Sequence, residues 1–135
     1  MECIFCKIVN KDIPARIIFE NENYLSFLDI EPNSIGHALV IPKKHITNFT
    51  AETPEQAAEH MKITHQIARQ LNELLSSDGF NVAINNGRVA GQLIDHVHWH
   101  IIPRYANDGF EHFPHSQAAK NKLDETFKKI HGQIK

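Results

Sequence analysis

The chain has 135 residues, of which 41% are hydrophobic, and this is enough for one core of ordinary size. The 14 basic and 16 acidic residues give a formal net charge of -2 without a basic block, so a long nucleic acid is excluded as the expected partner. No segment is long and apolar enough to span a bilayer, and the first residues show no leader pattern. We therefore expect a cytoplasmic protein with no membrane partner and with one domain over residues 1–135.

Apolar runs and turn signals predict the elements of the first half of the chain. Three short apolar runs predict β-strands, at residues 17–19, 24–28 and 36–42, the first two joined as a hairpin. Thr53, Pro54 and Gln56 form the pattern of a helix start with a capping box. Apolar residues at helical spacing continue this helix to about Leu75.

The second half of the chain predicts two more strands and a second helix. The strands are expected at residues 80–85 and 96–102, on either side of a loop with two glycines, and the helix begins after Ser116 as N-cap. Because the strands are joined locally, with one long helix inserted after the third, we predict an α+β fold. Its sheet is an antiparallel meander of about five strands, and a C-terminal helix follows. The motif-bearing core covers about residues 3–104, and residues 105–135 form a tail.

Three histidines alternate with apolar residues in the segment 96–102. Alternate side chains of a strand share a face, so His96, His98 and His100 are expected to lie together while the intervening apolar residues face a core. Histidine can act as nucleophile, acid, base or metal ligand near neutral pH. Burying three of them as core filler would cost free energy without compensation, so the pattern predicts a functional site.

The segments Gly91–Arg104 and Asp29–His45 resemble the two diagnostic stretches of the histidine triad (HIT) family, and the N-terminal Cys-x-x-Cys is similar to that of its bacterial members. The likeness covers the chain from about Cys3 to Arg104. It implies a nucleotide hydrolase that acts at the α-phosphate of a purine nucleoside monophosphate derivative, such as a phosphoramidate, through a covalent nucleotidyl intermediate on His98. It also implies a homodimer paired through the long helix and an edge strand.

The resemblance also assigns roles to single residues. His98 is the nucleophile, a role that suits a neutral imidazole, and the backbone carbonyl of His96 would fix its tautomer. Asp29 matches the position that binds the ribose hydroxyls. The implied catalytic residues are His37, His96, His98 and His100, and the implied substrate-binding residues are Asp29, His37, Asn85, Gly91, Gln92 and His100. Leu93 stands where phosphoramidate-cleaving members carry a hydroxyl residue, which leaves a dinucleoside polyphosphate of the Ap4A type open as the alternative substrate.

Cys3 and Cys6 have a spacing that indicates metal or redox chemistry in a reducing compartment. The histidine pair that usually follows such cysteines in zinc sites is missing. Some HIT proteins and the related hexose-phosphate uridylyl transferases complete the set from further along the chain, which implies Cys3, Cys6, His45 and His96 as ligands of a structural zinc. Four protein ligands leave no open position, so no catalytic metal is required. A pair of reduced thiols without metal is the simpler alternative.

Two other functions stay open from the residues alone. The three triad histidines could share a catalytic zinc with an open water position, which would make the protein a metal-dependent hydrolase. The chain could instead be a nucleotide-binding module with vestigial catalysis. In the tail, His112, Phe113 and His115 either close over the pocket or are ordinary surface residues.

Overall fold

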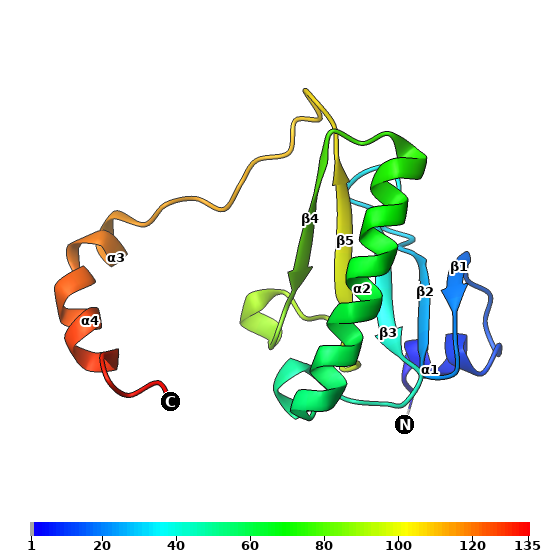
Figure 1. Cartoon of the computed structure of the whole chain (residues 1–135), viewed down its shortest axis with the longest axis horizontal. Helices are drawn as coiled ribbons and strands as arrows, with labels where there is room; N and C mark the ends of the chain where they lie inside the picture. Colours follow the sequence, from blue (N-terminus) through cyan, green and yellow to red (C-terminus); the bar gives the residue numbers. More distant parts are fainter. Residues whose placement is uncertain (1) are drawn as a thin grey trace.

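A computed structural model describes residues 2–135 and shows one open antiparallel sheet flanked by helices (Figure 1). The strands are β1 (Ile17–Glu20), β2 (Tyr24–Leu28), β3 (Ala38–Pro42), β4 (Gly79–Ile84) and β5 (Trp99–Arg104). Their order in the sheet is β1-β2-β3-β5-β4. The predicted α+β class and antiparallel five-stranded sheet are confirmed. The long helix carries the chain across the sheet, so β4 takes the outer edge and β5 returns between β3 and β4.

The helices are α1 (Ile4–Val9), α2 (Pro54–Leu75), α3 (Gln117–Asn121) and α4 (Leu123–Ile130), with 3-10 turns at Phe49–Ala51 and Arg88–Ala90. The predicted capping box of α2 is present, because Thr53 Oγ1 accepts from the Gln56 amide at 3.1 Å and Gln56 Oε1 accepts from the Thr53 amide at 2.9 Å. The helix ends where Ser76 adopts a left-handed conformation with φ 51°. Within residues 2–135, no helix combines the length and apolar character needed to cross a membrane.

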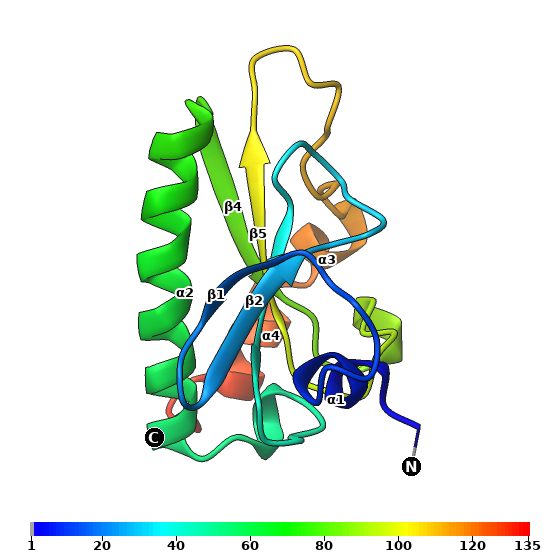
Figure 2. The same ribbon diagram turned by 90° about the vertical axis from the view of Figure 1, so that its right-hand side faces the viewer.

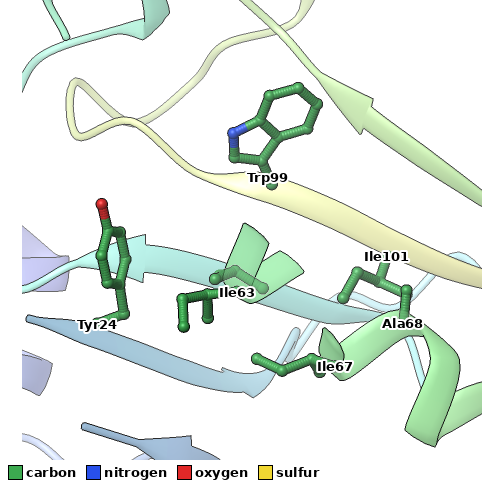
Figure 3. Close-up of a cluster of buried hydrophobic side chains, with 7 residues drawn as sticks. Tyr24, Ile63, Ile67, Ala68, Trp99 and Ile101 are labelled. Atoms are coloured by element: carbon green, nitrogen blue, oxygen red, sulfur yellow. The ribbon is translucent and has the colours of Figure 1, made fainter. Parts of the chain in front are cut away.

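Helix α2 covers one face of the sheet, as Figure 2 shows in profile. The apolar cluster beneath it consists of Tyr24, Val40, Ile63, Ile67, Ala68, Trp99 and Ile101 (Figure 3). Each fully buried side chain of this size contributes about 1.5–3 kcal/mol. This face therefore supplies much of the stability of the domain.

The opposite face of the sheet carries α1, a helix that sequence reasoning did not predict. Phe5 and Ile8 of α1 are buried against apolar side chains of β2 and β3, namely Leu25, Phe27, Leu39 and Ile41. Its N-cap is the thiol of Cys3, which accepts from the Cys6 amide at 3.4 Å. This packing places α1 and the two cysteines next to the segment that carries His96 and His98.

The predicted histidine strand begins three residues too early. Strand β5 begins at Trp99, so His96 and His98 lie in an irregular segment before it. The cause is a change of partner, because the Val97 amide donates to the Ile46 carbonyl in a loop at 2.7 Å, whereas pairing with β3 begins only at Trp99. The expected alternation persists from His98 onwards, since the rings of His98 and His100 lie 5.0 Å apart between centroids while Trp99 and Ile101 belong to the apolar cluster under α2.

Other elements also differ from the prediction at their ends or in their continuity. Strand β3 begins at Ala38 because Gly36 turns the chain with φ 90°, a conformation that favours glycine. Strand β4 ends at Ile84, so Asn85 follows it. The single predicted C-terminal helix is divided into α3 and α4 at Lys122.

Candidate active site and metal centre

His98 presents one nitrogen to solvent and has the other fixed. Its side chain is only 7% exposed, and Nδ1 donates to the His96 carbonyl at 2.7 Å. Phe5 of α1 packs edge-on against the ring, with centroids 5.2 Å apart. No group in residues 2–135 bonds to Nε2, and this nitrogen is not fully buried, so it keeps contact with solvent. A neutral His98 therefore offers an unprotonated Nε2 in a fixed direction.

A chain of hydrogen bonds fixes the proton positions of the two neighbouring histidines. The Asn33 amide donates to His37 Nδ1 at 3.0 Å, so the proton of a neutral His37 lies on Nε2. That nitrogen donates to His100 Nδ1 at 3.0 Å, which places the His100 proton on its own Nε2. This last N–H is buried and has no hydrogen-bond partner among residues 2–135.

The unpaired N–H of His100 lies beside the nucleophile candidate, since the rings of His98 and His100 are 5.0 Å apart between centroids. A buried N–H donor without an acceptor lowers the stability of the folded protein. The unpaired N–H of His100 is therefore suited to an acceptor that a ligand supplies. An anionic oxygen is the acceptor that benefits most from a preorganised donor. The pair can therefore combine attack on an electrophile with stabilisation of its oxygen.

Burial keeps these histidines neutral. It lowers the pKa of His96 to about 4, and it likewise lowers the pKa of His100 to about 4. Burial also lowers the pKa of His98 and of His37, although the nearby Asp29 carboxylate works in the opposite direction on both. At pH 7 the site is thus an array of neutral imidazoles in which the tautomers described above apply.

The other predicted binding residues surround this array. Asp29 Oδ2 lies 3.7 Å from His37 Nε2, and Oδ1 accepts from the Glu31 amide at 2.9 Å. Asn85 and Gly91 meet directly, because a Cβ on Gly91 would lie 3.3 Å from Asn85 Nδ2, and Gly91 has φ 96°. A side chain at Gly91 would therefore strain the backbone and displace Asn85.

Gln92 is placed differently from the expectation of a side-chain amide that meets phosphate. Its Nε2 donates to the Thr47 carbonyl at 2.7 Å and to the Ile94 carbonyl at 3.0 Å. Its Oε1 accepts from the Gly87 amide at 2.9 Å. Because both amide hydrogens are engaged, this geometry supports a role in holding the loop between β4 and the histidines and leaves no free hydrogen for a phosphate.

Cys3, Cys6, His45 and His96 form the cluster implied by the resemblance, with all four ligand atoms within 4.8 Å of one another. Cys3 Sγ lies 3.4 Å from His96 Nδ1, and Cys6 Sγ lies 3.3 Å from His45 Nδ1. Tetrahedral zinc, with bonds of about 2.0–2.3 Å, places its ligands at separations of this order. The His96 Nε2 proton is donated to the Pro42 carbonyl at 2.8 Å, which leaves Nδ1 free to ligate.

The protonation state of the Cys6 thiol bears on the binding of a cation. Burial, and then the hydrogen bond with Cys3, raises the pKa of Cys6 to about 11. The Cys6 thiolate that ligates a metal therefore forms at neutral pH only when a cation compensates its charge. The donor set of two sulfurs and two nitrogens fits zinc, with no open position for water.

A catalytic zinc shared by the three triad histidines is not supported by the geometry. The ring of His96 faces the cysteines, and Nδ1 of His98 is engaged with a carbonyl. Among residues 2–135, the second group of possible metal ligands is Asp29, His37 and His100. In that group, His37 and His100 already form a hydrogen bond with each other, which occupies the nitrogens that a metal would need.

Sequence reasoning missed three contributors to the site. Phe5 packs against both His96 and His98, the Asn33 amide sets the tautomer of His37, and the Pro42 carbonyl sets that of His96. The two backbone groups have no signal in the sequence. For Phe5, the spacing of Cys3 and Cys6 at i and i+3 is the signal that could have indicated a helix with an inward apolar side.

Comparison with known proteins identifies the class of protein that has this fold and site. The HIT domain family model matches residues 10–107, and the chain belongs to the HIT family. The chain is 44% identical over 104 residues to the adenosine 5'-monophosphoramidase of Schizosaccharomyces pombe, covering 77% of this chain and 75% of that protein.

Two solved structures extend the comparison. A HIT family protein from Bacillus subtilis has a TM-score of 0.87 at 39% identity, covering 100% of this chain and 99% of that one. A zinc-bound histidine triad family protein from Mycobacterium smegmatis has a TM-score of 0.77 at 39% identity, with 99% of each chain covered. These similarities confirm the family and the fold predicted from the two motifs.

Proposed function

We propose that this protein hydrolyses a purine nucleoside monophosphate derivative at its α-phosphate, with AMP phosphoramidate as the first substrate to consider, through a covalent nucleotidyl intermediate on His98. The observation that carries the proposal is the free Nε2 of His98 beside the unpaired N–H of His100. Similarity to an adenosine 5'-monophosphoramidase supports the substrate class.

In the first step, the Nε2 lone pair of His98 forms a bond to the α-phosphorus as the bond to the leaving nitrogen breaks. The amine leaves with the bonding electron pair and takes a proton from water. The His98 Nδ1 proton stays on Nδ1 and is donated to the His96 carbonyl, which stabilises the positive charge that the ring acquires. His100 donates to a phosphate oxygen, where charge is spread during transfer.

In the second step, water adds to phosphorus as the bond to His98 breaks, which releases AMP, a proton and the neutral ring. We propose that Asp29 accepts hydrogen bonds from the ribose hydroxyls and that His37 supports His100 through its Nε2 proton. Asn85 and Gly91 form the wall next to the phosphate, and Gln92 holds the loop that carries it.

The zinc that Cys3, Cys6, His45 and His96 would hold is structural, since its shell is complete. It would attach α1 to the segment that carries the nucleophile. We also propose a homodimer and a cytoplasmic location, the latter supported by the absence of a disulfide between Cys3 and Cys6.

A dinucleoside polyphosphate is the alternative substrate. Leu93 is 71% exposed and has no hydroxyl to donate to a leaving amine, which favours a leaving group that departs without such help, such as a polyphosphate chain. A binding module without turnover is the remaining alternative.

The decisive experiment assays adenosine phosphoramidate and a dinucleoside polyphosphate side by side with the parent protein, His98→Ala and His65→Ala. His65 lies on α2 and is exposed, so it serves as the matched control. We expect His98→Ala to lose at least about 10³-fold in kcat/KM on the preferred substrate, as for removal of a covalent nucleophile. Equal rates for His98→Ala and the parent would rule out the mechanism, and no turnover by either would leave only binding.

The intermediate and the metal can be tested on the same preparations. Denaturation at alkaline pH, where the P–N bond of a nucleotidyl-histidine survives, should leave the label of an adenine-labelled substrate on the peptide that contains His98, and label elsewhere would contradict the assignment. Metal analysis should find about one zinc per parent chain and almost none in the double variant Cys3→Ser Cys6→Ser. A parent protein without metal would contradict the zinc site.

A further inference from the structure

Cys3 and Cys6 are neighbours at the start of α1, where Cys3 is the N-cap. The Cys6 amide donates to Cys3 Sγ at 3.4 Å, and both sulfurs belong to the group whose ligand atoms lie within 4.8 Å of one another. Cysteines at this spacing at the start of a helix form the disulfides of redox-active proteins. The pair is therefore placed for a second chemistry besides metal binding.

The two sulfurs differ in their access to solvent. Among the described residues, Cys3 lines a cavity of about 390 Å³ and Cys6 does not. The walls of this cavity include the exposed residues Glu2, Arg88 and Leu93, so the cavity is open to small solutes. A small oxidant in solution therefore reaches Cys3 first, and Cys6 is the second sulfur of the pair.

Both sulfurs also contact the residues that hold the proposed nucleophile. Cys3 Sγ and Cys6 Sγ lie 3.4 Å and 3.6 Å from His96 Nδ1. The carbonyl of the same His96 accepts from His98 Nδ1 at 2.7 Å. Phe5, between the two cysteines in the sequence, packs against the rings of His96 and His98. A change in the bonding of the sulfurs therefore acts on the groups that orient His98.

We propose that Cys3 and Cys6 form a reversible redox switch, in which a peroxide joins the two sulfurs in a disulfide and so releases the cation that they hold. Cys3 Sγ attacks an oxygen of hydrogen peroxide, the O–O bond breaks, and water leaves, which gives a sulfenic acid at Cys3. Cys6 Sγ then attacks Cys3 Sγ, and the S–O bond breaks as a second water leaves. Two electrons pass from the sulfurs to the peroxide. Starting from thiolates, solvent supplies the two protons that complete the waters.

Oxidation removes half of the ligands in the cluster. Disulfide sulfurs are not thiolate donors, so only His45 and His96 remain, fewer than the four ligands of a structural zinc site. A small thiol reductant reverses the change by attack on the disulfide, after which the reduced pair binds the metal again. The redox step does not depend on the proposed activity, whereas its effect on turnover rests on the proposed function.

Treatment of the zinc-loaded full-length protein with about one equivalent of hydrogen peroxide tests the switch. The mass of the chain should fall by two hydrogen atoms, both cysteines should resist alkylation, and a chromogenic chelator should detect the released zinc in parallel. Dithiothreitol followed by zinc should restore all three properties. Cysteines that stay open to alkylation, or that gain oxygen atoms which dithiothreitol does not remove, would overturn the proposal.

Turnover measured on the same samples tests the connection to His98. In the oxidised protein, kcat/KM should fall about 10–100-fold, the range for loss of a group that supports a ligand or a reacting residue. Unchanged turnover of the oxidised protein would contradict a switch of the site. If the parent shows no turnover at all, the proposed function fails, and the alkylation and zinc measurements still decide the redox step.

Two matched single variants test the order of attack. In Cys6→Ser the reaction should stop at the sulfenic acid of Cys3, which dimedone traps as a stable adduct. In Cys3→Ser the less accessible Cys6 should give at least about 10-fold less adduct, because susceptibility follows exposure. Equal amounts of adduct in the two variants would contradict the role of the cavity. The double variant Cys3→Ser Cys6→Ser is the control, and peroxide should leave its residual turnover unchanged.

Discussion

The two faces of the five-stranded sheet use histidine in opposite ways. On the α2 face, His60 is fully buried, and both ring nitrogens are paired, Nδ1 with Glu52 Oε1 at 2.7 Å and Nε2 with the Val40 carbonyl at 2.8 Å. On the other face, His98 and His100 each keep one nitrogen unpaired. A histidine whose hydrogen bonds are complete has nothing left for a ligand, whereas an incomplete one is available for chemistry. Burial alone therefore does not distinguish a structural histidine from a functional one.

The largest expected effect lies on the α2 face. Glu52→Ala should lower the free energy of unfolding by about 3–5 kcal/mol, because it leaves His60 buried without its carboxylate partner. Urea denaturation measures this loss, with Glu59→Ala as control, at an exposed position on α2, the helix that carries His60. In the fraction that remains folded, kcat/KM should be unchanged. A stability equal to that of the parent would show that the two faces do not differ in this way.

The opposite result is expected for His100→Ala. Removal of one preorganised donor to a phosphate oxygen should reduce kcat by about 10²–10³-fold, with little change in the denaturation midpoint. Steady-state kinetics on the substrate preferred by the parent provide the measurement. Loss of stability without loss of kcat would assign His100 to the structural class represented by His60.

A pH series sharpens the comparison further. Burial lowers the pKa of His37 and His100 in the folded protein, for His100 to about 4, below the value near 6.5 of the unfolded chain. Between pH 6.5 and pH 4 the unfolded chain thus binds more protons, so the free energy of unfolding should fall as the pH falls through this window. The fall should be shallower in His100→Gln than in the parent, and equal slopes would contradict the linkage.

The smallest effect is expected at the cap of α2, distant from the histidines. Thr53→Ala removes the acceptor of the Gln56 amide and should cost about 1 kcal/mol of stability. Thermal unfolding followed by circular dichroism measures the change, and catalytic constants should match those of the parent. A large loss of activity here would show that α2 acts on the site and does more than pack against the sheet.

Local rules in the sequence predicted a large part of the fold. Helix α2 could be placed to the residue because its start is marked by Thr53, Pro54 and Gln56. Helix α1 could not, because six residues with β-branched members and a thiol cap carry no helix signal. The start of β5 was misplaced because an alternating pattern continues through His96 and His98, where the chain has already left the sheet.

In the site, only the side chains that a family motif specifies could be predicted from the sequence. The cluster of Cys3, Cys6, His45 and His96 came from such a motif, and the structure brings the four together. The Asn33 amide and the Pro42 carbonyl set the tautomers of His37 and His96. Backbone amides and carbonyls are common to the whole chain, so the sequence does not show which of them bonds a histidine. The pairing of Gln92 with its own loop was unpredictable for the same reason, since all three partners are backbone atoms.

His96 has two ends with different partners, its ring in the cysteine cluster and its carbonyl on the His98 imidazole. The proposed metal position and the proposed nucleophilic ring of His98 are thus linked through a single residue, His96, and one hydrogen bond. Cobalt(II) exchanged into the cluster would act as an optical reporter at that distance, and its visible absorption should respond when a nucleotide analogue contacts the neighbouring ring. The same link fixes the spacing of the motif, because one residue inserted between His96 and His98 would separate the imidazole from the carbonyl that orients it.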